Sequence, residues 1–350
     1  MARLSKRGRL HVLLMMIVGL LLGIHNIIQS RKVPKYYAPN YTPRDFSRYR
    51  MFGTSGAQDI INAHQHPSDC SKVRFLRVNP PASGFGSTVH KIGAYLAHAM
   101  NTNRVLILKD DSLHWWGAGN CRHLNGHECF FRPLTYCRPE DESKIDDYVE
   151  GTVDLANEMP AMLNIDKAPT GLPDTPDRQI KYWWRAQASA YILRLNLKTS
   201  LALKNRRVIQ CPITVHIRRG EKGREMILPD LGKYVSHIER IPSRGCIFLI
   251  TEDQEVVEQI VETYGKRVKY YNRHRTNADF STSLEENFLD ISNLFASLES
   301  THFVGTLGSN WDRLTDELRR VLVGPAKGCC TEFIEVGCPE DTCAVDTRNW

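Results

Sequence analysis

Several patterns that would give an early indication of function are absent from this chain. It contains no Asp-x-Asp motif, the carboxylate pair through which many enzymes bind a divalent ion. Its ten cysteines include no Cys-x-x-Cys pair, so the spacing that closed zinc sites usually show is missing. It also lacks a complete Gly-x-Gly-x-x-Gly sequence, and dinucleotide binding is therefore poorly supported.

Strong positive charge is lacking as well. The formal net charge is +7 over 350 residues, and part of it lies in two short blocks near the amino terminus. The remaining basic residues form no stripe of the kind that duplex nucleic acid requires, so we expect no nucleic-acid partner. What is present is the composition of a folded, enzyme-sized chain, because 42% hydrophobic residues can bury one large core or two domains.

The amino terminus predicts a membrane anchor. Residues 1–9 carry four basic side chains and precede an apolar segment, residues 10–28, which at about 1.5 Å per residue can just cross a bilayer core of roughly 30 Å. A cleaved signal peptide is the alternative, but no Ala-x-Ala cleavage site follows the segment. The charge pattern predicts a cytosolic tail, a signal-anchor helix and a lumenal remainder, beginning with a stem over residues 29–70 that carries a glycosylation sequon at Asn40.

The cysteines agree with a lumenal compartment, where disulfide bonds persist. We expect bridges within the cluster at residues 121–137 and within the carboxyl-terminal cluster at residues 329–343. Buried free thiols remain an alternative for Cys211 and Cys246, because each begins a predicted core strand.

The first half of the globular region predicts one βαβ unit within an amino-terminal α/β domain, residues 71–205. An apolar strand at 73–78 leads through a glycine loop to a helix at 89–100, and a second strand follows at 104–108. A long helix is predicted from about 179 to 197, in which Trp183 and Trp184 are expected to be core residues.

The second half, residues 206–325, alternates regularly between strands and helices, which predicts a parallel sheet covered by helices. A Cys-rich tail, residues 326–350, follows. The expected strands are 212–218, 246–250, 267–271 and 302–306, and the expected helices are 229–240, 253–264, 284–299 and 310–322. Ligands of open α/β sheets bind outside the carboxyl ends of the strands, where three polar clusters converge: Arg218-Arg219, Thr251 to Asp253, and Thr306 to Asn310.

Each of these clusters also has a purely structural interpretation. Asp253 fits the N-cap of the following helix, and Ser309 with Asp312 fits a capping box. Asp290 falls among apolar positions at the margin of a buried helix face, and two glycines in a turn commonly only let the backbone bend.

The motifs taken together resemble the α1,6-fucosyltransferase family. The resemblance covers roughly residues 73–322 in the same order. Its segments are His216 to Lys222, Thr251 to Asp253, the helix with Asp290 followed by Gly308-Ser309-Asn310, Ser83 to Gly86 with His90, Phe131 to Pro133, and Trp183-Trp184 with Gln187 and Tyr191. The resemblance implies a GT-B-like Golgi type II membrane enzyme with two Rossmann-like domains, which uses GDP-fucose without a metal ion or other cofactor and inverts the anomeric configuration.

The resemblance also assigns roles to individual positions. Arg218 and Arg219 would hold the diphosphate with Lys222 close by, and Glu225 would be the base beside the acceptor hydroxyl. The remaining donor-site positions that it implies are His216, Glu221, Tyr234, Glu252 and Asp253 (guanine or ribose), Asp290, Ser309, Asn310, Gly84 and Gly86.

Departures from the family concentrate around the acceptor and the base. Glu221 and Glu252 stand where the family has Asp, Asn310 stands where it has Gln, and the segment from His216 to Glu225 is one residue shorter. We expect the Cys-rich tail to stand in place of the carboxyl-terminal SH3-like domain of the family. The acceptor therefore stays open between the core GlcNAc of an N-glycan, another glycan and a protein hydroxyl.

Two other classes remain as alternatives. A catalytically silent lumenal glycan-binding protein would keep the fold with altered carboxylates. A sulfotransferase would need a basic residue in the loop at residues 83–87, which has none.

Overall fold

The computed structural model describes the α/β body of the chain. The described residues are 54–79, 83–109, 126–149, 158–163, 176–206, 209–224, 226–272, 284–298, 300–323 and 333–336. The predicted cytosolic tail, anchor, most of the stem with Asn40, and Glu225 lie outside them. Among the helices that are described, none has both the length and the apolar character needed for a bilayer crossing.

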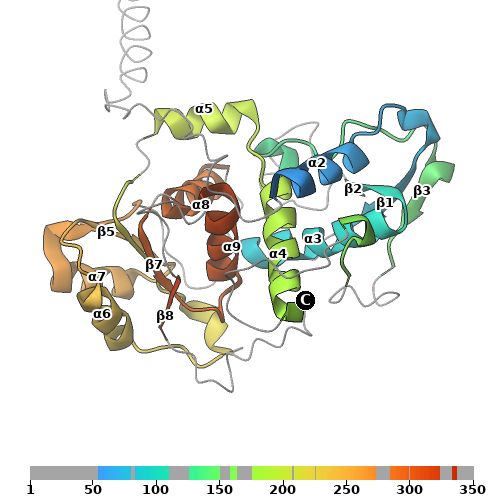
Figure 1. Ribbon diagram of the computed structural model, residues 1–350. Helices are drawn as coiled ribbons and strands as arrows, with labels where there is room; N and C mark the ends of the chain where they lie inside the picture. Colours follow the sequence, from blue (N-terminus) through green and yellow to red (C-terminus); the bar gives the residue numbers. More distant parts are fainter. Residues whose placement is uncertain are drawn as a thin grey trace, which may run out of the picture. The chain divides into compact units, whose positions relative to one another are not determined.

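The first sheet has three parallel strands in the order β2-β1-β3 (Figure 1). The strands are β1 (Arg74–Val78), β2 (Arg104–Leu108) and β3 (Ile145–Asp147), and the accompanying helices are α2 (Thr54–Gln65) and α3 (Phe85–Asn101). The predicted βαβ unit is confirmed. Helix α3 begins four residues earlier than predicted, because Gly84 is its N-cap and the glycine loop forms its first turn.

The second sheet has five parallel strands in the order β6-β5-β4-β7-β8. They are β4 (Ile213–His216), β5 (Ile247–Ile250), β6 (Val268–Lys269), β7 (His302–Gly305) and β8 (Phe333–Glu335). The chain adds strands on one side of β4 and then crosses back to its other side, so β4 and β7 form a topological switch point. The predicted alternation is confirmed, and α/β architecture with parallel sheets follows from it.

Strand β8 was not predicted, since its three residues were assigned to the Cys-rich tail. It extends the sheet beside β7, with Val336 donating its N–H to Gly305 O at 3.0 Å. Three residues are too few to show the alternation by which a strand is recognised in a sequence.

Helices cover both faces of the second sheet (Figure 1). Helices α6 (Leu231–Arg240) and α7 (Gln254–Tyr264) pack on the face that presents Val215 and Leu249. Helix α8 (Leu284–Leu298) packs on the face that presents Phe248. Helix α9 (Asn310–Leu318) follows β7 and continues into a π-helical turn at Arg319–Val323.

The single helix predicted over 179–197 is two helices, α4 (Pro176–Ile192) and α5 (Leu197–Asn205). Asn196 separates α4 from α5, because its side chain makes hydrogen bonds there. Its Oδ1 accepts the N–H of Thr199 at 2.8 Å, as an N-cap does, and its Nδ2 donates to Glu128 O at 3.0 Å.

Six 3₁₀ turns complete the described structure: Cys70–Lys72, Gly126–Cys129, Glu142–Lys144, Ala161–Leu163, Gly220–Arg224 and Gly265–Arg267.

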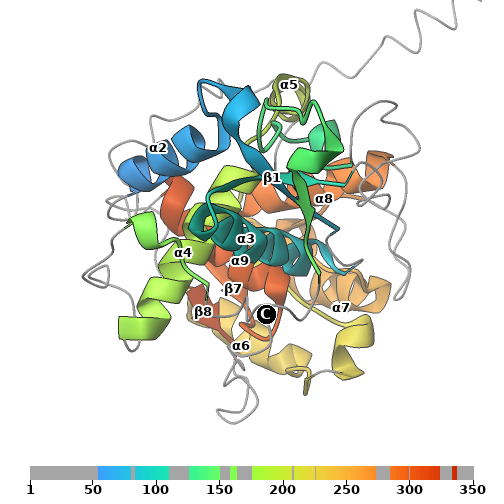
Figure 2. The same cartoon turned by 90° about the vertical axis from the view of Figure 1, so that its right-hand side faces the viewer.

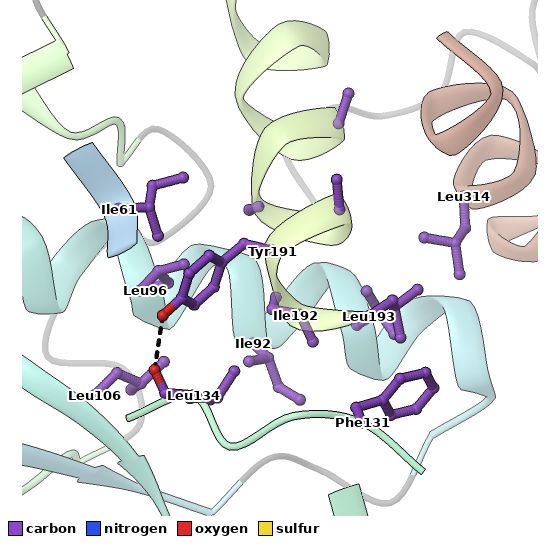
Figure 3. Close-up of a cluster of buried hydrophobic side chains, with 14 of the residues drawn as sticks. Ile61, Ile92, Leu96, Leu106, Phe131, Leu134, Tyr191, Ile192, Leu193 and Leu314 are labelled. Atoms are coloured by element: carbon purple, nitrogen blue, oxygen red, sulfur yellow. Dashed lines mark hydrogen bonds between the residues drawn. The ribbon is translucent and has the colours of Figure 1, made fainter. Parts of the chain in front are cut away.

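The largest apolar core joins helices from both halves of the chain (Figure 3). Ile61 of α2, Leu96 of α3 and Leu314 of α9 are all fully buried around α4. Tyr191 of α4 is buried with them, and its hydroxyl donates to Leu134 O at 2.8 Å. Trp183 and Trp184 are buried in the same core, as predicted.

Helices α3, α4 and α9 pack together (Figure 2). A group of buried charged side chains lies between them. Glu317 contacts His90 Nε2 at 2.8 Å and Arg185 Nε at 3.1 Å. Burial lowers the pKa of His90. Burial opposes ionisation of Glu317 too, but His90 and Arg185 together hold the pKa of its carboxyl below its usual value. An ionised Glu317 thus bridges helices of the first and second halves.

The disulfide predictions for Cys137 and for Cys211 and Cys246 need correction. Cys211 and Cys246 are bonded to each other, so they are not free thiols. Cys137 is bonded to Cys70, outside the cluster in which its partner was expected. Cys211 and Cys246 lie just before the paired strands β4 and β5, whose register brings the two Cα atoms to 5.0 Å. Strand pairing, which spacing in the sequence does not reveal, decided this partner.

Candidate functional site

The polar clusters predicted at the carboxyl edge of the second sheet do come together there. Strand β4 ends at His216, and Arg218 and Arg219 follow shortly after it. Strand β5 ends two residues before Glu252, and β7 ends immediately before Thr306. The edge is held by Ile217, whose N–H donates to Ile250 O at 2.9 Å, and by Thr251, whose hydroxyl donates to Ile217 O at 2.8 Å. Hydrogen bonds to the backbone between neighbouring strands therefore hold the candidate site in place.

Glu252 connects the two arginines to the end of β5. One oxygen of its carboxylate, Oε1, accepts the backbone N–H of Arg219 at 2.8 Å and pairs with the guanidinium of Arg218. The side chains of Arg218 and Glu252 keep 30% and 22% of their surface exposed, so this pair lies at the edge of a solvent-accessible space.

The guanidinium of Arg219 is held differently. Its Nη1 donates to Arg218 O at 3.1 Å, and its Cζ lies 5.8 Å from the ring centroid of Tyr234, a cation–π arrangement. Among the described residues it forms no ion pair, so its charge is not neutralised by them. Tyr234, which was expected at the donor site, is fully buried on α6.

His216 pairs with Asp312 at the switch point between β4 and β7. Nδ1 of the imidazole lies 2.5 Å from Oδ1 of Asp312, and both side chains are buried. Oδ2 of Asp312 accepts the N–H of Thr306 at 2.9 Å. Burial raises the pKa of the Asp312 carboxyl, and His216 opposes that shift.

The two capping predictions have different outcomes. Asp253 is the N-cap of α7, where its Oδ1 accepts the N–H groups of Glu255 at 2.8 Å and Val256 at 3.3 Å. Ser309 is the N-cap residue of α9 but makes no side-chain capping bond, so the capping box with Asp312 is wrong. The Asp312 carboxylate is taken by His216 and Thr306 instead.

Asn310 and the glycine loop meet across the two halves of the chain. Asn310 Nδ2 donates to Ser87 Oγ at 2.6 Å. A Cβ atom added to Gly86 would lie 2.5 Å from Asn310 O, whereas at Gly84 it would meet nothing within 4 Å. Gly86 thus allows α3 to approach the start of α9, and Gly84 borders open space.

The other predicted residues have the following places. Lys222 is half-buried in the 3₁₀ turn Gly220–Arg224, which begins at a glycine with φ 59°. Of Glu221 only the backbone is described, in the same turn. Asp290 is half-buried on α8, at the margin of its buried face as predicted. In the part of the chain that the structure describes, no group of three or more His, Cys, Asp or Glu side chains could hold a metal ion.

Asp312 is the residue that reasoning from the sequence missed. The only sequence pattern that included Asp312 was its position three residues after Ser309, and we interpreted that spacing as part of a helix cap. Gly305, which leaves room for the Asp312 carboxylate, gave no signal at all.

One protein family matches most of the chain. Residues 54–324 match the family of alpha-(1,6)-fucosyltransferase N- and catalytic domains. No curated protein matches the chain.

Among solved structures, the chain is similar to fucosyltransferase NodZ from Bradyrhizobium, with 14% identity over 69% of this chain and 92% of that one and a TM-score of 0.40. It is similar to POFUT1 in complex with GDP-fucose, with 12% identity over 76% and 99% of the two chains and a TM-score of 0.42. A variant of Arabidopsis thaliana FUT1 in complex with GDP shares 8% identity over 80% and 78%, with a TM-score of 0.45. Since the family match spans most of the chain, this protein belongs to the alpha-(1,6)-fucosyltransferase catalytic-domain family and is a fucosyltransferase.

Proposed function

We propose that this enzyme transfers fucose from GDP-fucose to a glycan acceptor with inversion, forming an α1,6 linkage to the core GlcNAc of an N-glycan. The observation that carries the proposal is the arginine pair at the carboxyl end of β4, with Arg219 unneutralised by any described carboxylate. A second support is its place beside the switch point of a parallel sheet, where nucleotides bind in this kind of fold.

The chemistry of fucose transfer suits these side chains. As the bond between the fucose anomeric carbon and the phosphate oxygen breaks, negative charge accumulates on GDP. Guanidinium groups that are already oriented stabilise that charge, and one such donor in a partly desolvated site lowers the barrier by about 3 kcal/mol. Arg219 supplies the donor, and Glu252 fixes the backbone and neighbouring arginine that orient it.

We propose that the reaction needs no metal ion. Many transferases of nucleotide sugars use a divalent ion, held by an Asp-x-Asp motif, to neutralise the diphosphate. Arg219, which no described carboxylate neutralises, supplies positive charge directly, and a guanidinium matches two phosphate oxygens at once.

The proton of the acceptor hydroxyl needs a base, and we propose Glu225 for this role. A positioned carboxylate that accepts this proton contributes about 100-fold or more to the rate. In the sequence Glu225 comes six residues after Arg219, so both proposed functions belong to one short stretch of the chain.

A lumenal setting is part of the proposal. The disulfides Cys70–Cys137 and Cys211–Cys246 are typical of proteins that fold in an oxidising compartment. The basic residues 1–9 and apolar residues 10–28 favour a single-pass type II Golgi membrane protein with a GT-B-like catalytic part of two Rossmann-like domains.

One observation favours a second candidate, a glycan-binding protein without turnover. The pairing of Glu252 with Arg218 neutralises one of the two arginines inside the protein, and Glu252 also departs from the family residue. Such a protein would bind GDP or glycans weakly and transfer nothing.

The test uses the purified full-length chain in detergent. Affinities for GDP, UDP and ADP are measured by calorimetry, and glycan and glycoprotein acceptors are incubated with GDP-fucose and analysed by mass spectrometry. We expect selective GDP binding and a mass increase of one fucose that persists in EDTA. Selective GDP binding without transfer to any acceptor would support the second candidate, and activity abolished by EDTA and restored by Mn²⁺ would contradict the metal-free mechanism.

A further inference from the structure

Asp312 is placed more elaborately than a helix residue needs to be. It is fully buried in the first turn of α9, and each carboxylate oxygen has one partner: Oδ1 faces His216 Nδ1 at 2.5 Å and Oδ2 accepts Thr306 N–H at 2.9 Å. Burying a carboxylate is unfavourable unless it is paired and hydrogen-bonded. A solvent-exposed carboxylate on the first turn of α9 would interact as favourably with the helix dipole and would avoid the cost of burial.

The end of β7 makes room for this carboxylate. A Cβ atom added to Gly305 would lie 2.8 Å from Asp312 Cγ and 2.9 Å from Oδ1, closer than real side chains approach. The glycine at this position, the N–H of Thr306 and the imidazole of His216 therefore form one cradle. Its geometry fixes the Asp312 side chain in a single position.

The position of the Asp312 carboxylate determines which nitrogen of the His216 ring carries a proton. With Asp312 ionised, the contact of 2.5 Å between its Oδ1 and Nδ1 of the imidazole places a proton on Nδ1. Nε2 then is the nitrogen left for another partner, and among the described residues it has none. The His216 side chain keeps 6% of its surface exposed, so it reaches the edge of the site from a buried position.

The side chains of His216 and Arg218 point to the same side of the extended backbone. The ladder continues beyond β4, since Ile217 N–H donates to Ile250 O at 2.9 Å, and alternate residues of an extended chain point to the same side. Ile217 is buried in the core on the opposite face. The imidazole and the guanidinium thus flank the same edge of the sheet.

We propose that Asp312 is a positioning residue that acts through His216. It holds the ring so that Nε2–H donates to an oxygen of the nucleotide diphosphate beside Arg218. Because a phosphate oxygen only accepts, the ring carries protons on both nitrogens in the nucleotide complex, the second coming from solvent, and the buried carboxylate supplies the opposite charge. This inference rests on the proposed use of GDP-fucose.

The direct measurement is a nitrogen NMR spectrum of the full-length protein with ¹⁵N-labelled histidine, with and without GDP. Signals of His216 are assigned by their loss in His216→Gln. We expect Nδ1 to be protonated in the free protein and both nitrogens to be protonated with GDP. A GDP-bound spectrum in which either nitrogen of His216 lacks a proton overturns the proposal without any Asp312 variant.

A double-mutant cycle then separates positioning from mere structural support. Asp312→Asn keeps an acceptor for Thr306 N–H but offers its amide N–H to Nδ1, so the ring loses its counter-charge. We expect GDP affinity to fall about tenfold in Asp312→Asn, and to fall less than twofold when the same change is added to His216→Gln. Glu262→Gln, an exposed carboxylate on α7, is the control for charge loss and should leave affinity unchanged.

The possible failures are distinguishable. If the wild-type protein binds no GDP, the proposed function itself is wrong. If it binds GDP but Asp312→Asn binds equally well, or if the two losses multiply in the double variant, only the role of Asp312 is wrong. Melting temperatures of all variants show whether a lower affinity reflects a lost fold.

Discussion

The carboxylate of Glu252 holds the backbone of Arg219 at the edge of the second sheet, with Oε1 at 2.8 Å from the Arg219 nitrogen. The same oxygen pairs with the guanidinium of Arg218. One residue at the end of β5 thus fixes both arginines that follow β4. A resemblance to the family assigns Glu252 to guanine or ribose, whereas its contacts in the structure are with the arginines.

Replacement of Glu252 tests which of these roles matters. Glu252→Ala should lower turnover with GDP-fucose about tenfold or more, because a hydrogen bond to a charged group contributes about 1.5–3 kcal/mol. Glu252→Gln should lose less, since its amide oxygen can still accept Arg219 N–H. Glu258→Gln, an exposed carboxylate on α7, is the matched control. If Glu252 instead recognises guanine, both variants will lose their preference for GDP over ADP in calorimetry.

The arginine pair should carry most of the donor-site chemistry. Arg219→Ala is expected to reduce turnover by two or more orders of magnitude, since one lost charge-assisted donor raises the barrier by about 3 kcal/mol. Arg219→Lys should recover little, because an ammonium cannot bind two phosphate oxygens as a guanidinium does. Steady-state kinetics with GDP-fucose measure both. Near-native turnover with alanine at both Arg218 and Arg219 would exclude this donor site.

Glu225 is the proposed base, and Glu221 in the preceding turn is its rival. A group that acts only on the acceptor proton is dispensable for donor binding, so Glu225→Gln should keep GDP affinity and lose transfer. Glu221→Gln should weaken GDP binding as well, if Glu221 supports Lys222 or the arginines. Calorimetry and turnover are measured side by side. Normal turnover in Glu225→Gln would remove this residue from the mechanism.

The two glycines of the α3 loop should respond differently to alanine. Gly86→Ala places a methyl group 2.5 Å from the backbone oxygen of Asn310, so α3 and α9 must separate, and stability to urea should fall by about 2 kcal/mol. Gly84→Ala meets nothing within 4 Å and should be neutral for stability. If the nucleotide approaches Gly84, this control will still lose GDP affinity. Equal stability of the two variants would contradict the close approach.

Acid should destabilise the fold through His127. Its ring is buried, Nε2 donates to Ile192 O at 2.8 Å, and burial lowers its pKa to about 4. Between its unfolded value of 6.5 and about 4, the unfolded chain binds a proton that the folded chain does not. Stability from this group is therefore present above pH 6.5 and is lost as the pH falls towards 4, by about 3 kcal/mol. Urea unfolding of wild type and His127→Gln at several pH values measures the difference, and parallel profiles would contradict the assignment.

Local patterns in the chain were enough to predict the α/β class and the sheet edge at which the candidate site lies. Alternation of β-branched strands with amphipathic helices fixed the order of elements from β4 to α9, because each element needs only its own periodicity to be recognised. The chain direction of a parallel sheet then placed Arg218, Glu252 and Thr306 at one edge. The motif from His216 to Lys222 pointed to the family, since its residues are contiguous.

Which distant residues contact one another could not be predicted from local patterns. Asp312 is 96 residues from His216, and Asn310 is 223 residues from Ser87, so no local pattern joins them. The same holds for the bond between Cys70 and Cys137 and for the pairing of β8 with β7. Such contacts depend on strand register and on which backbone segments can approach, as at Gly86 and Gly305. A sequence states which groups are available, but only close packing of distant segments selects which of them meet.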